Sequence, residues 1–229
     1  MWSFGMRGVV IVAAGRGTRI GEDKVWLPLG GIPVVAYCLR AFAACDPVPR
    51  IALVVIGDNL ARAHDLVGAL GIDAVVCKGG ELRQDSVRNG LDALGDVDLA
   101  AIHDGARPLV DPALIERCFA AADLHGAAVP GVPVRDTVKR VSADGWVRET
   151  VDRSELWTVQ TPQTFRLELL RRAYAALDGE VTDDAAAVER LGQPVKMVAG
   201  DPRNLKLTTR EDLAVARVLL GLPAFEGNS

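Results

Sequence analysis

Apolar and polar residues follow two rhythms along this chain of 229 residues. Short, uninterrupted runs of apolar and often β-branched residues alternate with longer segments in which apolar residues recur every three or four positions. An uninterrupted run is typical of a strand buried on both faces, whereas the three-to-four spacing indicates one face of a helix. The runs that predict strands are 9–14, 51–56, 74–77, 99–102 and, late in the chain, 195–198.

Helical spacing fills most of the intervals between these strands. Asp85 or Ser86 is expected to cap one of these helices, and Thr208 with Glu211 is spaced as a capping box that opens the last one. The predicted helices begin at Pro33, span 60–70, carry Val87, Leu91 and Leu94, open at Asp111 and Pro112, carry Leu169 to Leu177, and follow Thr182 and Asp183. Strands that alternate with helices predict an α/β fold with a mostly parallel, Rossmann-like sheet and helices on both faces.

The rhythm changes at Pro130 and is lost in the segment 133–156, where ten of the 24 residues are charged. Asp144-Gly145 between β-branched residues predicts a β-hairpin. A polar two-stranded hairpin is marginally stable alone, so we expect it to pack on its own domain or on a second subunit. The interval 157–165 is predicted to be irregular, and Asn204 to Leu207 to be extended. The chain is therefore expected to form a single domain, residues 1–229, with 133–156 as a protruding arm.

Composition narrows the classes of function. The net charge of −4 argues against a broad nucleic-acid-binding face, so any cationic site must be local. The longest apolar runs are too short for a membrane-spanning helix, and the first eight residues lack the pattern of a signal peptide. Cys38, Cys45, Cys77 and Cys118 form no C-x-x-C pair, which favours buried, reduced thiols over a metal site. We therefore expect a soluble, cytoplasmic protein without membrane or nucleic-acid partners.

A glycine-rich loop follows the first predicted strand, in the sequence VAAGRGTR, and Lys24 lies a few residues further on. Glycines permit close approach of the backbone to a ligand, and N–H groups combined with Arg19 and Lys24 suit a polyphosphate. A dinucleotide-binding fingerprint would require glycine at Ile20, and the P-loop pattern is absent. The alternative interpretation is an ordinary strand-to-helix turn with incidental surface cations.

Further candidates lie where other predicted strands end, because ligands of open α/β sheets bind beyond the carboxyl ends of the strands. Asp104 is suited to ribose hydroxyls or a metal ion, although it can instead form an Asx-type turn before Pro108. Ser86 can donate to a nucleobase or cap a helix, and His103 is favoured as a structural hydrogen bonder. The four groups expected to converge are 15–19, 79–86, 103–107 and Lys206.

Seven motifs give the chain a resemblance to a known family. VAAGRGTR, HDGARP, VRDTVKRV, TVDRSELW, QTPQTF, TDDA and NLKLTT occur in the order found in the 2-C-methyl-D-erythritol 4-phosphate cytidylyltransferases. The first two motifs are shared by several nucleotidyltransferases, whereas the third and fourth are more discriminating. One departure lies at the loop lysine, where Asp23-Lys24-Val25 replaces the usual Pro-Lys-Gln and the preceding loop is shorter.

The resemblance implies an activity and a set of roles. The phosphate of methylerythritol phosphate would attack the α-phosphorus of CTP, giving 4-diphosphocytidyl-2-C-methyl-D-erythritol and pyrophosphate for isoprenoid biosynthesis. Arg19 and Lys24 would stabilise the transition state, while Arg153 and Lys206 would position the acceptor phosphate. The implied substrate-binding residues are Ala13, Ala14, Gly15, Gly17, Gly80 and Ser86, with Asp104, Arg107, Thr137 and Thr161 near the ribose or the methylerythritol.

The resemblance also implies partners. Mg²⁺ would be held on the CTP phosphates and by no protein ligand except Asp104 as an option, and the 133–156 arm would build a homodimer that shares its active sites. Two alternatives stay open at this point. One is a cytidylyltransferase for another polyol phosphate such as ribitol 5-phosphate, and the other is a nucleotide-binding regulatory module without activity.

Overall fold

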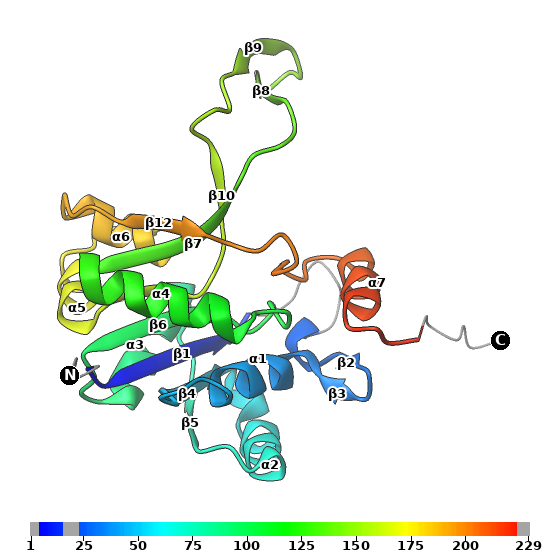
Figure 1. Ribbon diagram of the computed structural model, residues 1–229, viewed down its shortest axis with the longest axis vertical. Coiled ribbons are helices and arrows are strands. Elements are labelled where there is room, and N and C mark those ends of the chain that lie inside the picture. Colours follow the sequence, from blue (N-terminus) through cyan, green and yellow to red (C-terminus); the bar gives the residue numbers. More distant parts are fainter. Residues whose placement is uncertain (1–4, 16–22, 224–229) are drawn as a thin grey trace.

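The computed structural model of this protein describes residues 5–15 and 23–223, and its centre is an eight-stranded sheet (Figure 1). The strands of the sheet are β1 (Arg7–Ala13), β4 (Arg50–Val55), β5 (Ala74–Lys78), β6 (Leu99–Asp104), β7 (Ala127–Pro133), β10 (Trp157–Val159), β11 (Gln163–Arg166) and β12 (Lys196–Ala199). Their order is β10-β7-β11-β6-β1-β4-β5, with β12 on β7.

The sheet is parallel in its first half and mixed in its second. β1 pairs in parallel with both β4 and β6, and β4 pairs in parallel with β5. β11 runs antiparallel to β6 and β7, β10 runs antiparallel to β7, and β12 is parallel to β7. The prediction of a mostly parallel α/β sheet is confirmed, and the antiparallel strands are confined to one end.

Helices cover both faces of the sheet, as predicted. The helices are α1 (Val34–Ala43), α2 (Leu60–Leu70), α3 (Arg83–Leu94), α4 (Pro112–His125), α5 (Leu167–Ala175), α6 (Asp184–Arg190) and α7 (Arg210–Leu219). Side chains of β1 alternate between the two layers: Val9 and Ile11 pack with α1, α2 and α4, whereas Val10 packs with α3, α5 and α6. β1 is buried on both faces, which explains its uninterrupted apolar sequence.

A third, smaller hydrophobic cluster connects the segment around β2 (Pro28–Leu29) and β3 (Ile32–Pro33) to the last helix, α7. These two short strands form a hairpin, and Leu29 packs with Leu207 and with Leu213 of α7. Figure 1 shows α7 beside β2 and β3, apart from the main sheet. None of the helices in the described part of the chain is long and apolar enough to cross a membrane.

The predicted hairpin is confirmed. β8 (Val138–Val141) and β9 (Val147–Val151) pair antiparallel in a sheet of their own, with the loop of Asp144 and Gly145 between them. Figure 1 shows this hairpin at the end of two long connections, well away from the eight-stranded sheet. Its tip exposes apolar surface, because Trp146 is 74% exposed and Val141 and Val147 are also exposed.

Several predicted boundaries were wrong. The interval 157–165 is not irregular, since it contains β10 and the start of β11, and β7 was missed altogether. β6 extends to Asp104, two residues beyond its predicted end. The capping box of α7 uses Thr209 and Asp212, one position later than predicted. α3 begins at Arg83, so Asp85 and Ser86 lie inside its first turn and neither is its N-cap.

The packing of α3 on the sheet generates the first prediction. A methyl group on Gly90 would overlap Val10 of β1 and lie 2.8 Å from Val54 of β4. Both neighbours are fully buried, so we expect Gly90→Ala to destabilise the protein by about 1–3 kcal/mol through overpacking. Urea unfolding should show a lower midpoint with an unchanged slope.

The matched control is Gly68→Ala in α2, where a methyl group meets nothing within 4 Å. Because alanine is the better helix former by about 1 kcal/mol, this variant should be as stable as the parent or more stable. Equal midpoints for Gly90→Ala and the parent protein would contradict the tight packing of α3.

Candidate functional site

A cleft of about 1180 Å³ opens at the carboxyl ends of β1, β5 and β6. Its walls include glycine-rich backbone, cationic side chains and carboxylates. The residues that line the cleft include Ala13, Ala14 and Gly15 at the end of β1, Lys24, and Lys78 to Arg83 with Ser86 around the start of α3. Asp104 at the end of β6 and Lys206 also line it. The predicted convergence is therefore confirmed in part. Each of the four predicted groups contributes to the cleft, but His103, Gly105 and Arg107 do not line it, and Gly17 and Arg19 lie outside the described residues.

The loops after β1 and β5 approach each other closely on one wall of the cleft. A methyl group on Gly79 would lie 2.5 Å from Cβ of Ala14 and 2.8 Å from Oγ of Ser86, so only glycine fits here. The N–H of Gly80 donates to Ser86 Oγ at 3.1 Å, and the Ser86 hydroxyl donates to the carbonyl of Leu82 at 3.2 Å. Ser86 is 2% exposed and thus fixes the backbone of this loop.

Asp104, at the end of β6, is the centre of charge in the cleft. Lys206 Nζ lies 2.9 Å from Asp104 Oδ2, Arg107 Nε lies 3.7 Å from the same oxygen, and Arg83 Nη2 lies 3.7 Å from Oδ1. Burial disfavours the charged carboxylate, but Lys206 and Arg83 outweigh this effect and hold the pKa of Asp104 well below its ordinary value. Asp104 is therefore ionised at neutral pH, and its carboxylate is surrounded by three cations.

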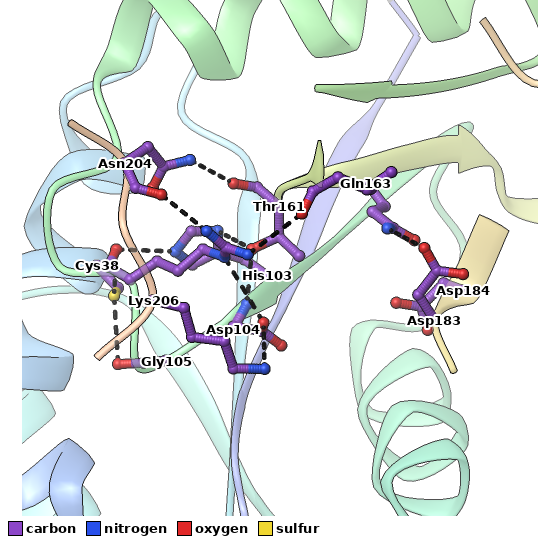
Figure 2. Close-up of polar contacts among 12 residues, drawn as sticks. Cys38, His103, Asp104, Gly105, Thr161, Gln163, Asp183, Asp184, Asn204 and Lys206 are labelled. Atoms are coloured by element: carbon purple, nitrogen blue, oxygen red, sulfur yellow. Dashed lines mark hydrogen bonds and ion pairs between the residues drawn. The ribbon is translucent and has the colours of Figure 1, made fainter. Parts of the chain in front are cut away.

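The segment that carries Lys206 is docked against the loop after β6. Asn204, which is fully buried, donates from Nδ2 to the carbonyl of Thr161 at 2.9 Å and accepts at its own carbonyl from Arg107 at 2.7 Å. The N–H of Leu207 donates to the carbonyl of Ala106 at 2.8 Å. Figure 2 shows Asn204 beside Thr161 and Lys206 beside Asp104. Arg107 and Thr161 are buried behind Asp104 and support it.

His103 is a structural residue, in agreement with its interpretation from the sequence. Its side chain is fully buried, Thr161 Oγ1 lies 3.1 Å from Nδ1, the carbonyl of Arg107 lies 3.3 Å from Nε2, and Phe42 packs edge-on against the ring. Both ring nitrogens have partners and neither faces the cleft. Burial lowers the pKa of His103 to about 4, so the imidazole is neutral near pH 7.

Arg83 was not singled out from the sequence, although it lines the cleft. It makes two hydrogen bonds to the buried Asp184, of 3.0 and 2.7 Å, and the hydroxyl of Tyr174 donates to the same carboxylate. The guanidinium therefore lies between Asp184 and Asp104. Lys78, at the end of β5, was also missed as a cleft residue. The available signal was the position of both cations beside Gly79 and Gly80, after a predicted strand.

Two predicted site residues lie elsewhere. Thr137 and Arg153 are exposed residues of the arm, before β8 and after β9, and they are not among the residues that line the cleft. Within one chain the structure therefore does not bring Thr137 and Arg153 together with Lys24 and Lys206.

The cysteines and carboxylates offer little for a metal ion. Within the described residues, no group of three or more His, Cys, Asp and Glu side chains is arranged to hold one. The four cysteines carry free thiols. Cys38, Cys45 and Cys118 are buried, as predicted, whereas Cys77 is only partly buried, so the prediction was wrong for this residue. Burial raises the pKa of each of these three thiols to about 12. Asp104 presents its carboxylate to Lys206, Arg83 and Arg107.

A mostly parallel α/β sheet with glycine backbone and cations at its carboxyl edge is typical of nucleotide-binding proteins. The model of the family "IspD: 2-C-methyl-D-erythritol 4-phosphate cytidylyltransferase" matches residues 8–221. The chain belongs to this family.

Individual relatives agree with this membership. The chain is 48% identical over 216 residues to the 2-C-methyl-D-erythritol 4-phosphate cytidylyltransferase of Dehalococcoides mccartyi, covering 93% of this chain and 95% of the relative. A crystal structure of 4-diphosphocytidyl-2C-methyl-D-erythritol synthase from Anaerococcus prevotii superposes with a TM-score of 0.84 at 29% identity, covering 94% and 96% of the two chains. The enzyme from Thermus thermophilus gives a TM-score of 0.78 at 35% identity, covering 95% and 100%.

The environment of His103 generates the second prediction. Its pKa is about 4 in the folded protein against 6.5 as the ordinary value, so between these pH values the unfolded chain binds a proton that the folded protein does not. Stability should therefore fall as the pH falls from 6.5 towards 4, by up to about 3 kcal/mol from this residue. Urea unfolding at pH 7, 6 and 5 measures the slope.

The comparison protein is His103→Gln, which keeps a polar side chain but has no proton to bind in this range. Its stability should depend less on pH across the same interval. Asp104 contributes little between pH 7 and pH 5, because the carboxyl of the unfolded chain takes up its proton near the ordinary pKa of 3.8 and that of the folded protein at a still lower pH. Identical slopes in the two proteins would contradict the neutral, buried imidazole.

Proposed function

We propose that this chain transfers CMP from CTP to 2-C-methyl-D-erythritol 4-phosphate, releasing pyrophosphate and giving 4-diphosphocytidyl-2-C-methyl-D-erythritol for isoprenoid synthesis. The observation that carries the proposal is the cleft in which Lys24 and Lys206 face the glycine-rich backbone after β1 and β5, in a chain that belongs to this family. Two phosphate groups must meet in such a reaction, and a cleft lined by cations lowers their mutual repulsion.

The nucleotide would bind on the wall formed by the two glycine-containing loops. The backbone around Ala13, Ala14 and Gly15 at the end of β1 would meet the nucleotide, together with Gly80, which is held in place by Ser86. Gly17 belongs to the same proposed contact. Because Ser86 already donates to Leu82 and accepts from Gly80, its proposed part in cytosine recognition is to position the backbone that meets the base.

The reaction is an in-line attack of the acceptor phosphate on the α-phosphorus, without a covalent enzyme intermediate. Charge on the phosphoryl oxygens and on departing pyrophosphate is stabilised by Lys24 and Arg19, through preorganised contacts of the kind that are worth about 2.7–4 kcal/mol each. Lys206 holds the acceptor phosphate in line. Its ammonium group is already oriented by Asp104 at 2.9 Å, so little reorganisation is needed when the phosphate arrives.

Magnesium enters this scheme with the substrate, as the Mg²⁺ complex of CTP. Phosphate oxygens are the ligands that Mg²⁺ prefers at nucleotide sites. Asp104, the carboxylate considered as a ligand, is surrounded by three cations, and this favours its role in orienting Lys206 and meeting hydroxyl groups of the substrates. Arg107 and Thr161 hold Asp104 from behind.

Arg153 and Thr137 would reach the cleft of a second subunit. Thr137 directly precedes β8 and Arg153 follows β9, and Figure 1 shows this hairpin well away from the eight-stranded sheet of its own chain. The exposed Trp146, Val141 and Val147 at the tip of the arm are apolar surface that a partner subunit could cover. We therefore propose a homodimer in which the 133–156 arm completes the neighbouring site. A cytoplasmic location stays a prediction.

Pyrophosphate release from CTP, Mg²⁺ and methylerythritol phosphate tests the proposed reaction. Ribitol 5-phosphate in place of methylerythritol phosphate should give far slower release. The opposite preference would support the alternative acceptor. Binding of CTP without any pyrophosphate release would instead support a regulatory module.

Substitution of the two lysines provides the third prediction. Lys24→Ala should lower kcat by about 10²–10³-fold, because a transition-state contact is lost. Lys206→Ala should mainly raise KM for the acceptor phosphate. Steady-state kinetics with each substrate varied separately distinguish these effects, and thermal unfolding controls for stability. A variant of Lys24 with full turnover, or a change in the CTP constant alone for Lys206, would refute the corresponding role.

A mixed dimer provides the fourth prediction. Subunits carrying Lys24→Ala and Arg153→Ala are co-expressed with different affinity tags, and the mixed species is isolated. If the arm crosses over, one site of the two receives both intact residues, so the mixed dimer should have about half the parent activity while each homodimer has little. Loss of activity in the mixed dimer would show that each arm serves its own chain.

A further inference from the structure

The residue before the loop lysine, where this chain departs from the family pattern, makes a side-chain hydrogen bond to a distant part of the chain. Lys24 opens the short 3₁₀ helix η1 (Lys24–Trp26), and the preceding residue, Asp23, also lines the cleft. Asn59 Nδ2 donates to Asp23 Oδ2 at 2.7 Å. Asn59 ends the 3₁₀ helix η2 (Gly57–Asn59), which leads directly into α2. The hydrogen bond therefore connects the chain beside Lys24 to the start of a packed helix.

A second contact from the same helix lies on the other side of Lys24. The guanidinium carbon of Arg62 lies 4.5 Å from the centroid of the Trp26 ring, and Arg62 Nη2 donates to the Trp26 carbonyl at 3.4 Å. Trp26 is only 4% exposed and belongs to the core under α1 and α2. The N-terminal end of α2 thus holds the residue before Lys24 and the residue two positions after it.

Asn59 is one of the groups that stabilise the carboxylate of Asp23. Its other oxygen, Oδ1, is buried and has no hydrogen-bond partner among the described residues. Burial raises the pKa of the Asp23 carboxyl. Hydrogen bonds from the backbone of Val25 and the side chain of Asn59 lower it, as do the positive charges of Arg62 and Lys24. Removing the Asn59 side chain would take away the hydrogen bond to Oδ2 and leave a partly buried charge less well satisfied, which is costly.

We propose that Asp23 and Asn59 are positioning residues for Lys24: their hydrogen bond fixes the backbone from which the lysine reaches the phosphates of the nucleotide. The backbone angle φ of Asp23 is −71°, within the range that a proline ring imposes covalently. A side-chain contact to α2 here restricts the chain where the family commonly has proline. This inference rests on the proposed cytidylyl transfer, since it assigns Lys24 its task.

Kinetics of four variants test the proposal. Asn59→Ala and Asp23→Ala should each lower kcat by about tenfold, with KM for the acceptor phosphate unchanged, because the lysine is displaced from the reacting phosphate. The double variant should lose no more than either single variant, since both substitutions remove one contact. Asp23→Asn, which keeps an oxygen acceptor for Asn59, should retain more activity than Asp23→Ala.

Rescue separates positioning from a general loss of stability. Asp23→Pro combined with Asn59→Ala fixes φ without the hydrogen bond, so it should recover most of the kcat that Asn59→Ala loses. Asp65 is an exposed residue of α2, the helix that follows Asn59, so Asp65→Ala is the matched control and should behave as the parent. Full kcat in Asn59→Ala, additive losses in the double variant, or thermal destabilisation without a kinetic change would each overturn the proposal.

A measurement without turnover keeps this test apart from that of the proposed function. Hydrogen exchange followed by mass spectrometry reports on a peptide that covers residues 23–29, in which the N–H groups of Trp26 and Leu27 donate to Asp23 and Lys24. Exchange should be at least about fivefold faster in Asn59→Ala and unchanged in Asp65→Ala. Unchanged exchange in Asn59→Ala refutes the contact even if the parent has no activity, whereas an inactive parent alone refutes only the function.

Discussion

The structure depends on one buried anion at the end of β6. Asp104 is 9% exposed at the edge of the cleft, and a charge with so little access to water is tolerated only when it is paired and hydrogen-bonded. Its partners come from three separate parts of the chain: Arg83 at the start of α3, Arg107 in the next turn, and Lys206. The ion pairs that make the carboxylate tolerable also hold two cations, Arg83 and Lys206, in the lining of the cleft, while Arg107 supports Asp104 from behind.

The strands and helices that carry their own local pattern could be predicted from the sequence. β1 and β4 are buried on both faces and are apolar throughout most of their length, and the hairpin of β8 and β9 is indicated by Asp144-Gly145. β7, β10 and β11 could not be found this way. β7 contains Pro130 inside a sheet, a position that proline usually avoids, and β10 and β11 have only three and four residues. Their strand structure comes from neighbours, not from their own residues.

The location of the site followed from the rule that ligands bind beyond the carboxyl ends of strands, and the resemblance supplied the roles. The support behind the site could not be predicted, because it joins residues far apart in the sequence. Arg83 and Asp184 are 101 positions apart, and no local pattern relates them. Asn59 and Asp23 are 36 positions apart. Ser86 shows the opposite case, since a position that reads locally as a helix cap is occupied by a residue that braces the loop of Gly80.

The docking of Asn204 against Thr161 joins a late part of the chain to an earlier one, so the cleft is completed late during synthesis. During synthesis the N-terminal part of a protein leaves the ribosome first, at about 5–20 residues per second. β6 and Asp104 therefore emerge long before Lys206, and β7 emerges before its partner β12. Until that late segment arrives, Asp104 lacks the ammonium group of Lys206, and Thr161 lacks its hydrogen bond from Asn204. A nascent chain that lacks the segment has the glycine-rich loop but not the completed cleft.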